Sequence, residues 1–144
     1  MATIRRAAVE DAPDIARLIV ELGYEATVEQ TEQGLRELDA SGEQAVFVAV
    51  EDDATVGLLA LQAVAMLHLA GASRRLARIN TLVVTKAARR CGIGARLIDH
   101  AVVEARALGC AGIELTTRVD RAEAQAFYAV QGFEQTSVRL YRRL

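Results

Sequence analysis

The sequence predicts one α/β domain of the α+β kind, in which helices flank a mixed β-sheet. Segments rich in β-branched residues alternate with segments whose apolar residues recur at helical spacing. Glycines and helix-capping residues separate these segments, and we find no repeat, low-complexity tract or linker in the sequence. A length of 144 residues is common for a domain with one core. We therefore expect a single domain over residues 1–144.

The N-terminal part predicts one strand and two helices. Residues 3–9 form the expected first strand. Asp11 is the expected N-cap of a first helix, which Gly23 can end. The Thr-Val-Glu-Gln sequence at residues 27–30 has the spacing of a capping box. It predicts a second helix that runs to about Leu38.

The middle of the chain predicts three strands in succession. Residues 44–50 and 55–67 are expected strands, and the acidic residues 51–53 form the turn between them. Residues 69–76 contain Gly-Ala-Ser and two arginines, which favour a loop. Residues 78–85 are again rich in β-branched side chains and form the next expected strand.

The C-terminal part alternates helix and strand. A helix is expected to follow the glycine-containing turn and to end near Leu108. A strand is expected at residues 113–118, and then a helix that Asp120 caps and Gly132 ends. Residues 135–142 are the expected closing strand. The pattern as a whole predicts six strands and four helices.

Composition and charge exclude several classes of function. A net charge of −2 gives no electrostatic argument for binding nucleic acid or an anionic membrane. The two cysteines, Cys91 and Cys110, and the two histidines, His68 and His100, do not have the spacing of metal ligands. The N-terminus lacks the apolar core of a signal peptide, and the apolar run at residues 56–67 is too short to span a bilayer. We therefore expect a cytoplasmic protein without a metal.

Residues 89–96, Arg-Arg-Cys-Gly-Ile-Gly-Ala-Arg, form the most informative local feature. They join a strand-like segment to a helix-like segment. The first backbone N–H groups of a helix have no partner within it, and they attract an anion together with the helix dipole. Gly92 and Gly94 allow a phosphate to approach these groups closely. The turn therefore predicts a ligand that carries phosphates.

A second motif, taken together with this turn, points to a family. Residues 89–94 match the pattern of Gln or Arg, two residues, Gly, one residue, then Gly or Ala. Ala124, Phe127-Tyr128 and Gly132-Phe133 match the pattern of Ala, two residues, Phe-Tyr, three residues, Gly-Phe. In both motifs, and in the order of elements over nearly the whole chain, the sequence resembles the GNAT superfamily of acetyl-CoA-dependent N-acetyltransferases.

The resemblance implies a strongly twisted mixed sheet of about six to seven strands, flanked by four helices and splayed between its fourth and fifth strands. Acetyl-CoA, the implied co-substrate, would lie in the split, with its pantetheine along residues 82–84 and its pyrophosphate near the N–H groups of residues 90–95. The expected cofactor-binding residues are Leu82, Val83, Val84, Arg89, Arg90, Cys91, Gly92, Ile93, Gly94, Ala95, Arg121 and Phe127. Of these, Cys91 is expected to contribute its backbone N–H rather than its thiol. Arg121 is either a phosphate ligand or a solvated residue of the first helical turn.

The implied reaction is the attack of a neutral amine on a thioester. An alkyl amine with a pKa near 10.4 is only about 0.1% neutral at pH 7.4, so the enzyme must assist its deprotonation. Tyr128 is the candidate general acid for the leaving thiolate, carried over from the family's Phe-Tyr pair. The alternative is that this pair only packs the helix onto the sheet.

The general base is the main departure from the family pattern. Many relatives carry Glu at the position of Asn80, and an amide cannot accept a proton at neutral pH. Three possibilities remain open. They are a water chain held by Asn80 and Thr81, another carboxylate such as Glu114, or no dedicated base.

The acceptor site is expected around the first two helices, where the resembled family builds it. Glu21, Tyr24 and Glu25 are the candidate substrate-binding residues, and acidic groups there would attract a cationic amine. A solvated helix face is the alternative interpretation.

The sequence thus predicts direct transfer of an acetyl group from acetyl-CoA to a primary amine in a ternary complex. A small-molecule amine is preferred as the acceptor, and a protein N-terminus or lysine is the alternative. A non-catalytic acyl-CoA-binding sensor is the rival from another class. A second copy of the chain is a candidate partner, to which residues 135–142 would contribute, whereas nucleic acid and membrane partners are not expected.

Overall fold

The computed structural model describes residues 1–42, 44–69 and 74–144. Within these residues the chain forms a five-stranded sheet in the order β1-β2-β3-β4-β5. Neighbouring strands from β1 to β4 are antiparallel, and β5 is parallel to β4. The strands are β1 Thr3–Arg6, β2 Gln44–Glu51, β3 Ala54–Ala65, β4 Arg75–Val84 and β5 Gly112–Leu115.

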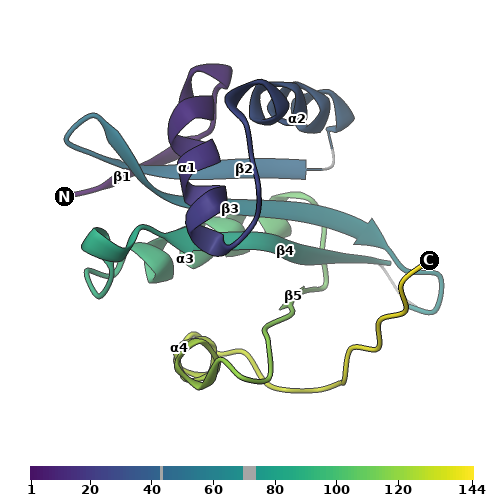
Figure 1. The fold of residues 1–144 in the computed structure, drawn as a ribbon. Helices are drawn as coiled ribbons and strands as arrows, with labels where there is room; N and C mark the ends of the chain where they lie inside the picture. Colours follow the sequence, from purple (N-terminus) through teal and green to yellow (C-terminus); the bar gives the residue numbers. More distant parts are fainter. Residues whose placement is uncertain (43, 70–73) are drawn as a thin grey trace.

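Helices cover both faces of the sheet (Figure 1). The helices are α1 Ala12–Leu22, α2 Val28–Ser41, α3 Ile93–Ala107 and α4 Ala122–Val130. A short 3-10 turn at Val9–Asp11 precedes α1. Another, at Lys86–Ala88, precedes the glycine-containing turn that leads into α3. α1 and α2 lie on one face, and α3 lies on the other, with α4 below the edge formed by β5. The described chain thus has the mixed α/β architecture that the sequence predicts.

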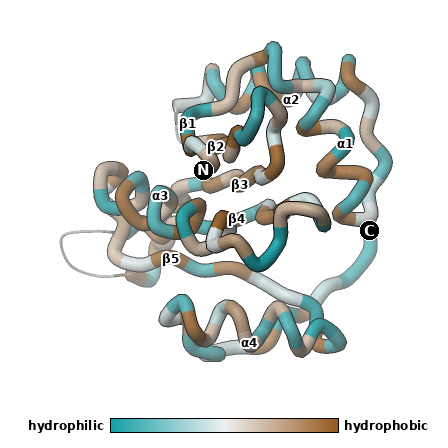
Figure 2. The backbone as a smooth tube through the Cα atoms, turned by 90° about the vertical axis from the view of Figure 1, so that its left-hand side faces the viewer, coloured by the Kyte–Doolittle hydropathy of each residue, from teal (hydrophilic) through white to brown (hydrophobic). Residues whose placement is uncertain are grey.

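Two apolar cores result from the alternation of side chains along the central strands. On β2, Val46 and Val48 point to the α1–α2 side, where they pack with Leu18. Phe47 points to the opposite side and joins the core around Leu97 of α3. The tube in Figure 2, coloured by hydropathy, shows β2, β3 and β4 between the two helical layers. Strands buried on both faces explain why these segments are so rich in aliphatic residues.

The closing strand predicted at residues 135–142 is not formed. This segment has no regular secondary structure, and Val138 and Leu140 are 80% and 91% exposed. Strand formation needs a paired neighbour and a face to bury, and a residue pattern alone supplies neither. The described sheet therefore has five strands rather than six to seven.

Two of the three expected helix starts have the predicted residue at the N-cap position. At Thr27 the predicted capping box is present, since its hydroxyl accepts from Gln30 N at 3.1 Å and its N–H donates to Gln30 Oε1 at 3.2 Å. Asp11 is the N-cap residue of α1, as predicted, but its side chain accepts from the N–H of Ala8 at 2.7 Å, at the start of the 3-10 turn, and makes no capping bond to α1. Asp120 does not cap α4, because Arg121 occupies the N-cap position.

The expected loop at residues 69–76 is only partly described. Residues 70–73 lie outside the described residues, and β4 begins at Arg75, before the predicted start at residue 78. The strand therefore begins within the segment expected to be a loop.

Gly57 marks the closest approach of the sheet to α3. A Cβ added there would lie 3.1 Å from Leu97 Cδ1 and 3.2 Å from both Ile93 Cγ2 and Ala49 Cβ.

We predict that Gly57→Ala lowers the free energy of unfolding by about 1–3 kcal/mol, because the close-packed neighbours must move. The measurement is equilibrium unfolding in urea. Gly34→Ala on α2 is the matched control, since its Cβ meets nothing within 4 Å. Equal stability of Gly57→Ala and the wild type would contradict this account.

Candidate functional site

The sheet opens between β4 and β5. These strands pair from Leu76 and Gly112 to Ile79 and Leu115, and β5 ends there. β4 continues to Val84, and over this last stretch it has no strand beside it on the β5 side in the described chain. This confirms the expected splay between the fourth and fifth strands. An extended ligand that carries amide groups can pair with the open edge as a further strand would.

A β-bulge at Asn80 accompanies the opening. Ala60 of β3 pairs with Thr81 and Leu61 pairs with Ile79, so Asn80 is the additional residue on β4. A bulge increases the local twist and bends its strand. Because it directly follows the last pair with β5, it accounts for the departure of β4 from its neighbour.

The bulge also changes which side chains face α3. Ile79 and Leu82 both pack against the α3 core, although regular alternation would place residues three apart on opposite faces. Val83 consequently faces α1 and the second core. The bulge therefore divides β4 into two segments with opposite alternation.

The turn between β4 and α3 presents backbone donors beside the split. Arg90 and Gly92 have positive φ angles of 65° and 79°, and α3 begins at Ile93. Such turns direct successive N–H groups to one side and form anion-binding concavities. In the described part of the chain, we find no acceptor for the N–H groups of residues 91–95. These donors fit the pyrophosphate of the expected co-substrate.

α4 closes against this turn through aromatic side chains. A Cβ at Gly94 would lie 3.1 Å from Phe127 Cζ, so only glycine allows this approach without displacing the ring. Tyr128 packs edge-to-face on Phe127 and Phe133, with ring centroids 5.4 Å and 5.9 Å away. Burial raises the pKa of the Tyr128 phenol, and the charge of Arg121 offsets only part of this effect. The phenol is therefore protonated at neutral pH.

The three candidate phosphate-binding arginines have different surroundings. Arg89 donates from Nε to the carbonyl oxygen of Val84 at 2.9 Å. Arg90 pairs with Glu123 at 3.1 Å, but both side chains are 87% exposed. An ion pair this exposed contributes little, so it does not hold Arg90 away from an anion. Arg121 is the exposed N-cap of α4.

Glu21 connects the end of α1 to the β4–α3 turn. Its carboxylate accepts from the N–H of Lys86 at 2.6 Å and from the hydroxyl of Thr85 at 2.9 Å. Burial would raise the pKa of Glu21, but these hydrogen bonds and the charges of Arg89 and Arg17 hold it below its ordinary value. The sequence indicated Glu21 only as an acceptor-side acid. A carboxylate in the last turn of a helix interacts unfavourably with the helix dipole. The position of Glu21 in the last turn was therefore the sequence signal that this carboxylate has a partner outside its helix.

Polar side chains line the sheet near the bulge. Asn80 donates from Nδ2 to Gln62 Oε1 at 3.4 Å. Arg78 donates from Nε and Nη2 to Glu114 Oε1 at 2.9 Å and 2.7 Å. On β5, the neighbours Ile113 and Leu115 pack against the α3 core. Glu114 lies between them, so its side chain is on the opposite face of the sheet. The structure thus places Glu114 on the side of α1 and α2, held by Arg78.

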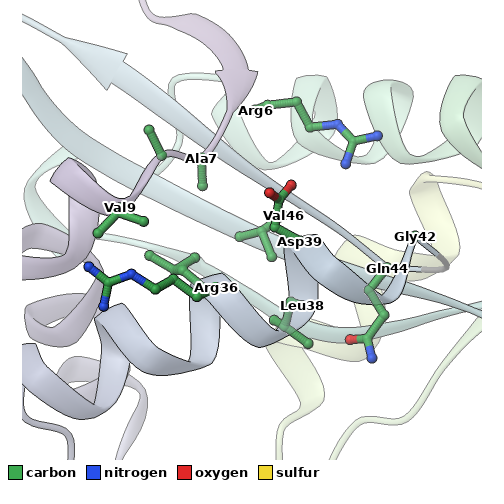
Figure 3. A pocket seen from close by; sticks show the side chains of 11 residues that line it. Arg6, Ala7, Val9, Arg36, Leu38, Asp39, Gly42, Gln44 and Val46 are labelled. Carbon is green, nitrogen blue, oxygen red and sulfur yellow. The ribbon is translucent and has the colours of Figure 1, made fainter.

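Two cavities lie beside α2. The larger, about 550 Å³, is lined by Arg6, Arg36, Asp39 and Gln44 together with aliphatic side chains, and its lining does not include the glycine turn (Figure 3). The smaller, about 290 Å³, lies between α1, α2 and the sheet, and Thr81 is part of its lining. Because Thr81 follows the bulge directly, only the smaller cavity adjoins the open part of β4.

The expected acceptor-site residues are not all brought together. Glu25 lines the smaller cavity, whereas Glu21 binds the β4–α3 turn. Tyr24 is 67% exposed and does not line either cavity. The structure also adds cavity-wall residues that the sequence did not indicate, such as Gly34 and Leu58, and it places Thr81, a candidate only for holding water, in the same wall. A cavity wall combines distant segments, so no local pattern indicated them.

Within the described ranges, no three His, Cys, Asp or Glu side chains are grouped as a metal ion would require. None of the helices described there has the length and apolar character needed to cross a bilayer.

Comparison with known proteins agrees with this geometry. The model of the Acetyltransferase (GNAT) family matches residues 12–133. The aminoalkylphosphonate N-acetyltransferase of Salmonella typhimurium is 29% identical over 146 residues, which cover 98% of this chain and 90% of the relative. A putative acetyltransferase from Agrobacterium tumefaciens has a solved structure with a TM-score of 0.88, 27% identity and 99% coverage of both chains. A transcriptional regulator from Bacillus halodurans also has a TM-score of 0.88, with 25% identity and full coverage of both chains.

The contacts of Glu21 predict a pH-dependent contribution to stability. Glu21→Ala removes two hydrogen bonds to a charged acceptor, so the free energy of unfolding at pH 7 should fall by about 1 kcal/mol. The folded-state pKa of Glu21 is depressed, so its contribution is fully present above the ordinary value of 4.5 and is lost as the pH falls through the folded value. Urea unfolding at a series of pH values measures this difference. Glu134→Ala, at an exposed position, is the control. A deficit for Glu21→Ala that stays constant down to pH 3 would contradict this account.

Proposed function

The chain belongs to the GNAT family of acetyltransferases, and on this premise we propose that it transfers the acetyl group of acetyl-CoA to the primary amine of a small molecule. The observation that carries the proposal is the open edge of β4 beside the N–H groups of residues 91–95, for which the described residues provide no acceptor. The two features offer adjoining sites for the amide-containing arm and the phosphates of one extended ligand.

The residues of the split fit that co-substrate. The edge at residues 82–84 would pair with the amides of the pantetheine arm, and the N–H groups of residues 91–95 would bind the pyrophosphate. Arg90 is free to move from Glu123 to a phosphate, because its present ion pair is exposed. Acetyl-CoA supplies the thioester that is broken in the transfer. The thioester would then lie near the bulge, accessible from the α1–α2 side.

We assign Tyr128 the role of proton donor to the departing sulfur. Burial among aromatic rings raises its pKa, which keeps the proton on the phenol at neutral pH, as a general acid requires. Its neighbour on α4, Phe127, contacts Gly94 of the turn, and Tyr128 packs against the same core, which supports a position beside the split. A residue with only a packing role would not need the hydroxyl.

Of the three routes for deprotonating the amine, we propose the water-mediated one. Glu114 is already held by two hydrogen bonds from Arg78, which makes it a poor candidate for the base. Asn80 and Gln62 lie at the bulge as a pair of amides, and Thr81 adds a hydroxyl next to them. Together they would order a water molecule that takes the proton from the amine to solvent.

A small acceptor is supported by two independent observations. The Salmonella relative is an aminoalkylphosphonate N-acetyltransferase, as its name states, so a small-molecule amine is the acceptor in a protein similar along nearly its whole length. The cavity next to Thr81 measures about 290 Å³, at the lower end of the size of ligand cavities. We therefore favour a small amine over a protein N-terminus or a lysine side chain.

Release of free thiol from acetyl-CoA, measured over a panel of primary amines, tests the proposal. We expect turnover that depends on the amine and exceeds the rate of acetyl-CoA hydrolysis. Tight binding of acetyl-CoA without thiol release on any amine would contradict the proposal and support the non-catalytic sensor.

The role of Tyr128 predicts a specific kinetic defect. Tyr128→Phe keeps the ring and its packing but removes the proton, so kcat should fall by roughly 10²-fold with little change in KM for acetyl-CoA. Steady-state kinetics with the best amine of the panel measure both constants. Tyr141→Phe, at an exposed position near the C-terminus, is the matched control. Wild-type kcat in Tyr128→Phe would show that the pair Phe127 and Tyr128 serves packing alone.

A further inference from the structure

The cavity between α1, α2 and the sheet has a chemical character that indicates the class of acceptor. This inference rests on the proposed acetyl transfer. We infer that the cavity selects apolar primary amines and rejects amines that carry an anionic group.

The walls are aliphatic on three sides. Ile15 and Ile19 come from α1, Leu35 and Leu38 from α2, and Leu58 from β3. An apolar substituent that enters this space replaces water against these side chains, which favours binding by about 25 cal/mol per Å² of apolar surface buried. An anionic group placed there would lose its hydration without gaining a cationic partner among the described lining residues.

Two of the four polar side chains in the described lining already form hydrogen bonds at the start of α2. The hydroxyl of Thr31 donates to the carbonyl oxygen of Thr27 at 2.8 Å. The amide oxygen of Gln30 accepts from the backbone N–H of Thr27 in the capping box, so Gln30 offers only neutral N–H donors to a ligand. Among the described residues, no hydrogen bond or ion pair engages the remaining two side chains, those of Glu25 and Thr81. Both offer oxygen acceptors, and an amine carries the matching N–H donors.

The charge of the lining complements a cationic group such as a protonated amine. Among the described residues that line the cavity, Glu25 is the single ionisable one, and neither Lys nor Arg is present. A phosphonate or carboxylate on the acceptor would therefore meet a like charge and no cation. This differs from what an acceptor with a phosphonate requires, since such sites use Arg, Lys or helix N-termini.

The position of Thr81 connects this chemistry to the transfer reaction. Thr81 follows Asn80 at the bulge, where β4 leaves β5. An amine that binds to Thr81 with its apolar part between α1 and α2 reaches the open side of β4. The cavity would then hold the apolar substituent of the acceptor, and the amine nitrogen of the acceptor would face the split between β4 and β5.

A panel of amines matched in length separates the two acceptor classes. We expect kcat/KM for alkyl and arylalkyl amines, such as butylamine and phenethylamine, to exceed that for 4-aminobutyrate and 3-aminopropylphosphonate by at least about 10-fold. Equal or better turnover of the anionic amines would overturn the inference and leave the proposed acetyl transfer intact. Absence of turnover with every amine would instead contradict the proposed function, and the inference with it.

Gly34 offers a variant that fills the cavity without strain. It lines the cavity from α2, and a Cβ at this position would meet no atom of the described residues within 4 Å. Gly34→Leu should raise KM for phenethylamine at least 10-fold and leave KM for acetyl-CoA unchanged. Gly34→Ala, which changes helix propensity but adds only one methyl group, is the matched control. Unchanged KM for phenethylamine in Gly34→Leu, with a folded protein, would show that the acceptor binds elsewhere.

Glu25→Gln tests the charge complementarity separately. It should raise KM for the apolar amines several-fold and leave KM for the anionic amines unchanged or lower. A uniform effect on both classes would contradict the role of Glu25 as the ionic partner of the amine.

Discussion

The divergence of β4 from β5 is the constraint on which the rest of the structure depends. The two strands pair over four residues and part after Ile79 and Leu115. The additional residue Asn80 follows at once, and its bulge bends and twists β4 away from its neighbour. The open edge of β4 is thereby retained within a well-packed domain instead of being closed by a further strand. The aromatic contacts of Phe127 with Gly94 then bring α4 to the other side of the opening.

Electrostatic contacts hold this opening in place from the α1 side. Glu21 links the last turn of α1 to Thr85 and Lys86, directly after β4. In the turn that follows, the N–H groups of residues 91–95 have no acceptor within the described chain, which is costly unless an anion or water satisfies them. Glu21 therefore connects α1, which lines the smaller cavity, to the segment between β4 and α3, which carries the N–H groups of residues 91–95. The proposed donor and acceptor sites would both lie along β4, one at its open edge and the other at its α1–α2 face.

The sequence predicted the features that depend on local chemistry. The capping box at Thr27 involves residues three apart, and the turn at Gly92 is defined by its own glycines and by the helix that follows. The bulge at Asn80 could not be predicted, because it is a property of the register between β3 and β4. Likewise, Glu21 meets its partners 64 and 65 residues further along the chain. Residues 135–142 show the reverse case, in which a strand-like pattern lacks a neighbour to pair with.

Amide chemical shifts and hydrogen exchange, recorded with and without acetyl-CoA, test the central claim most directly. The claim is that the open edge of β4 and the start of α3 form one binding site for this ligand. Acetyl-CoA should shift the resonances of residues 82–84 and 91–95 and slow the exchange of their amide protons. Changes confined to the cavity at Arg6 and Arg36, with residues 82–84 and 91–95 unaffected, would contradict the claim.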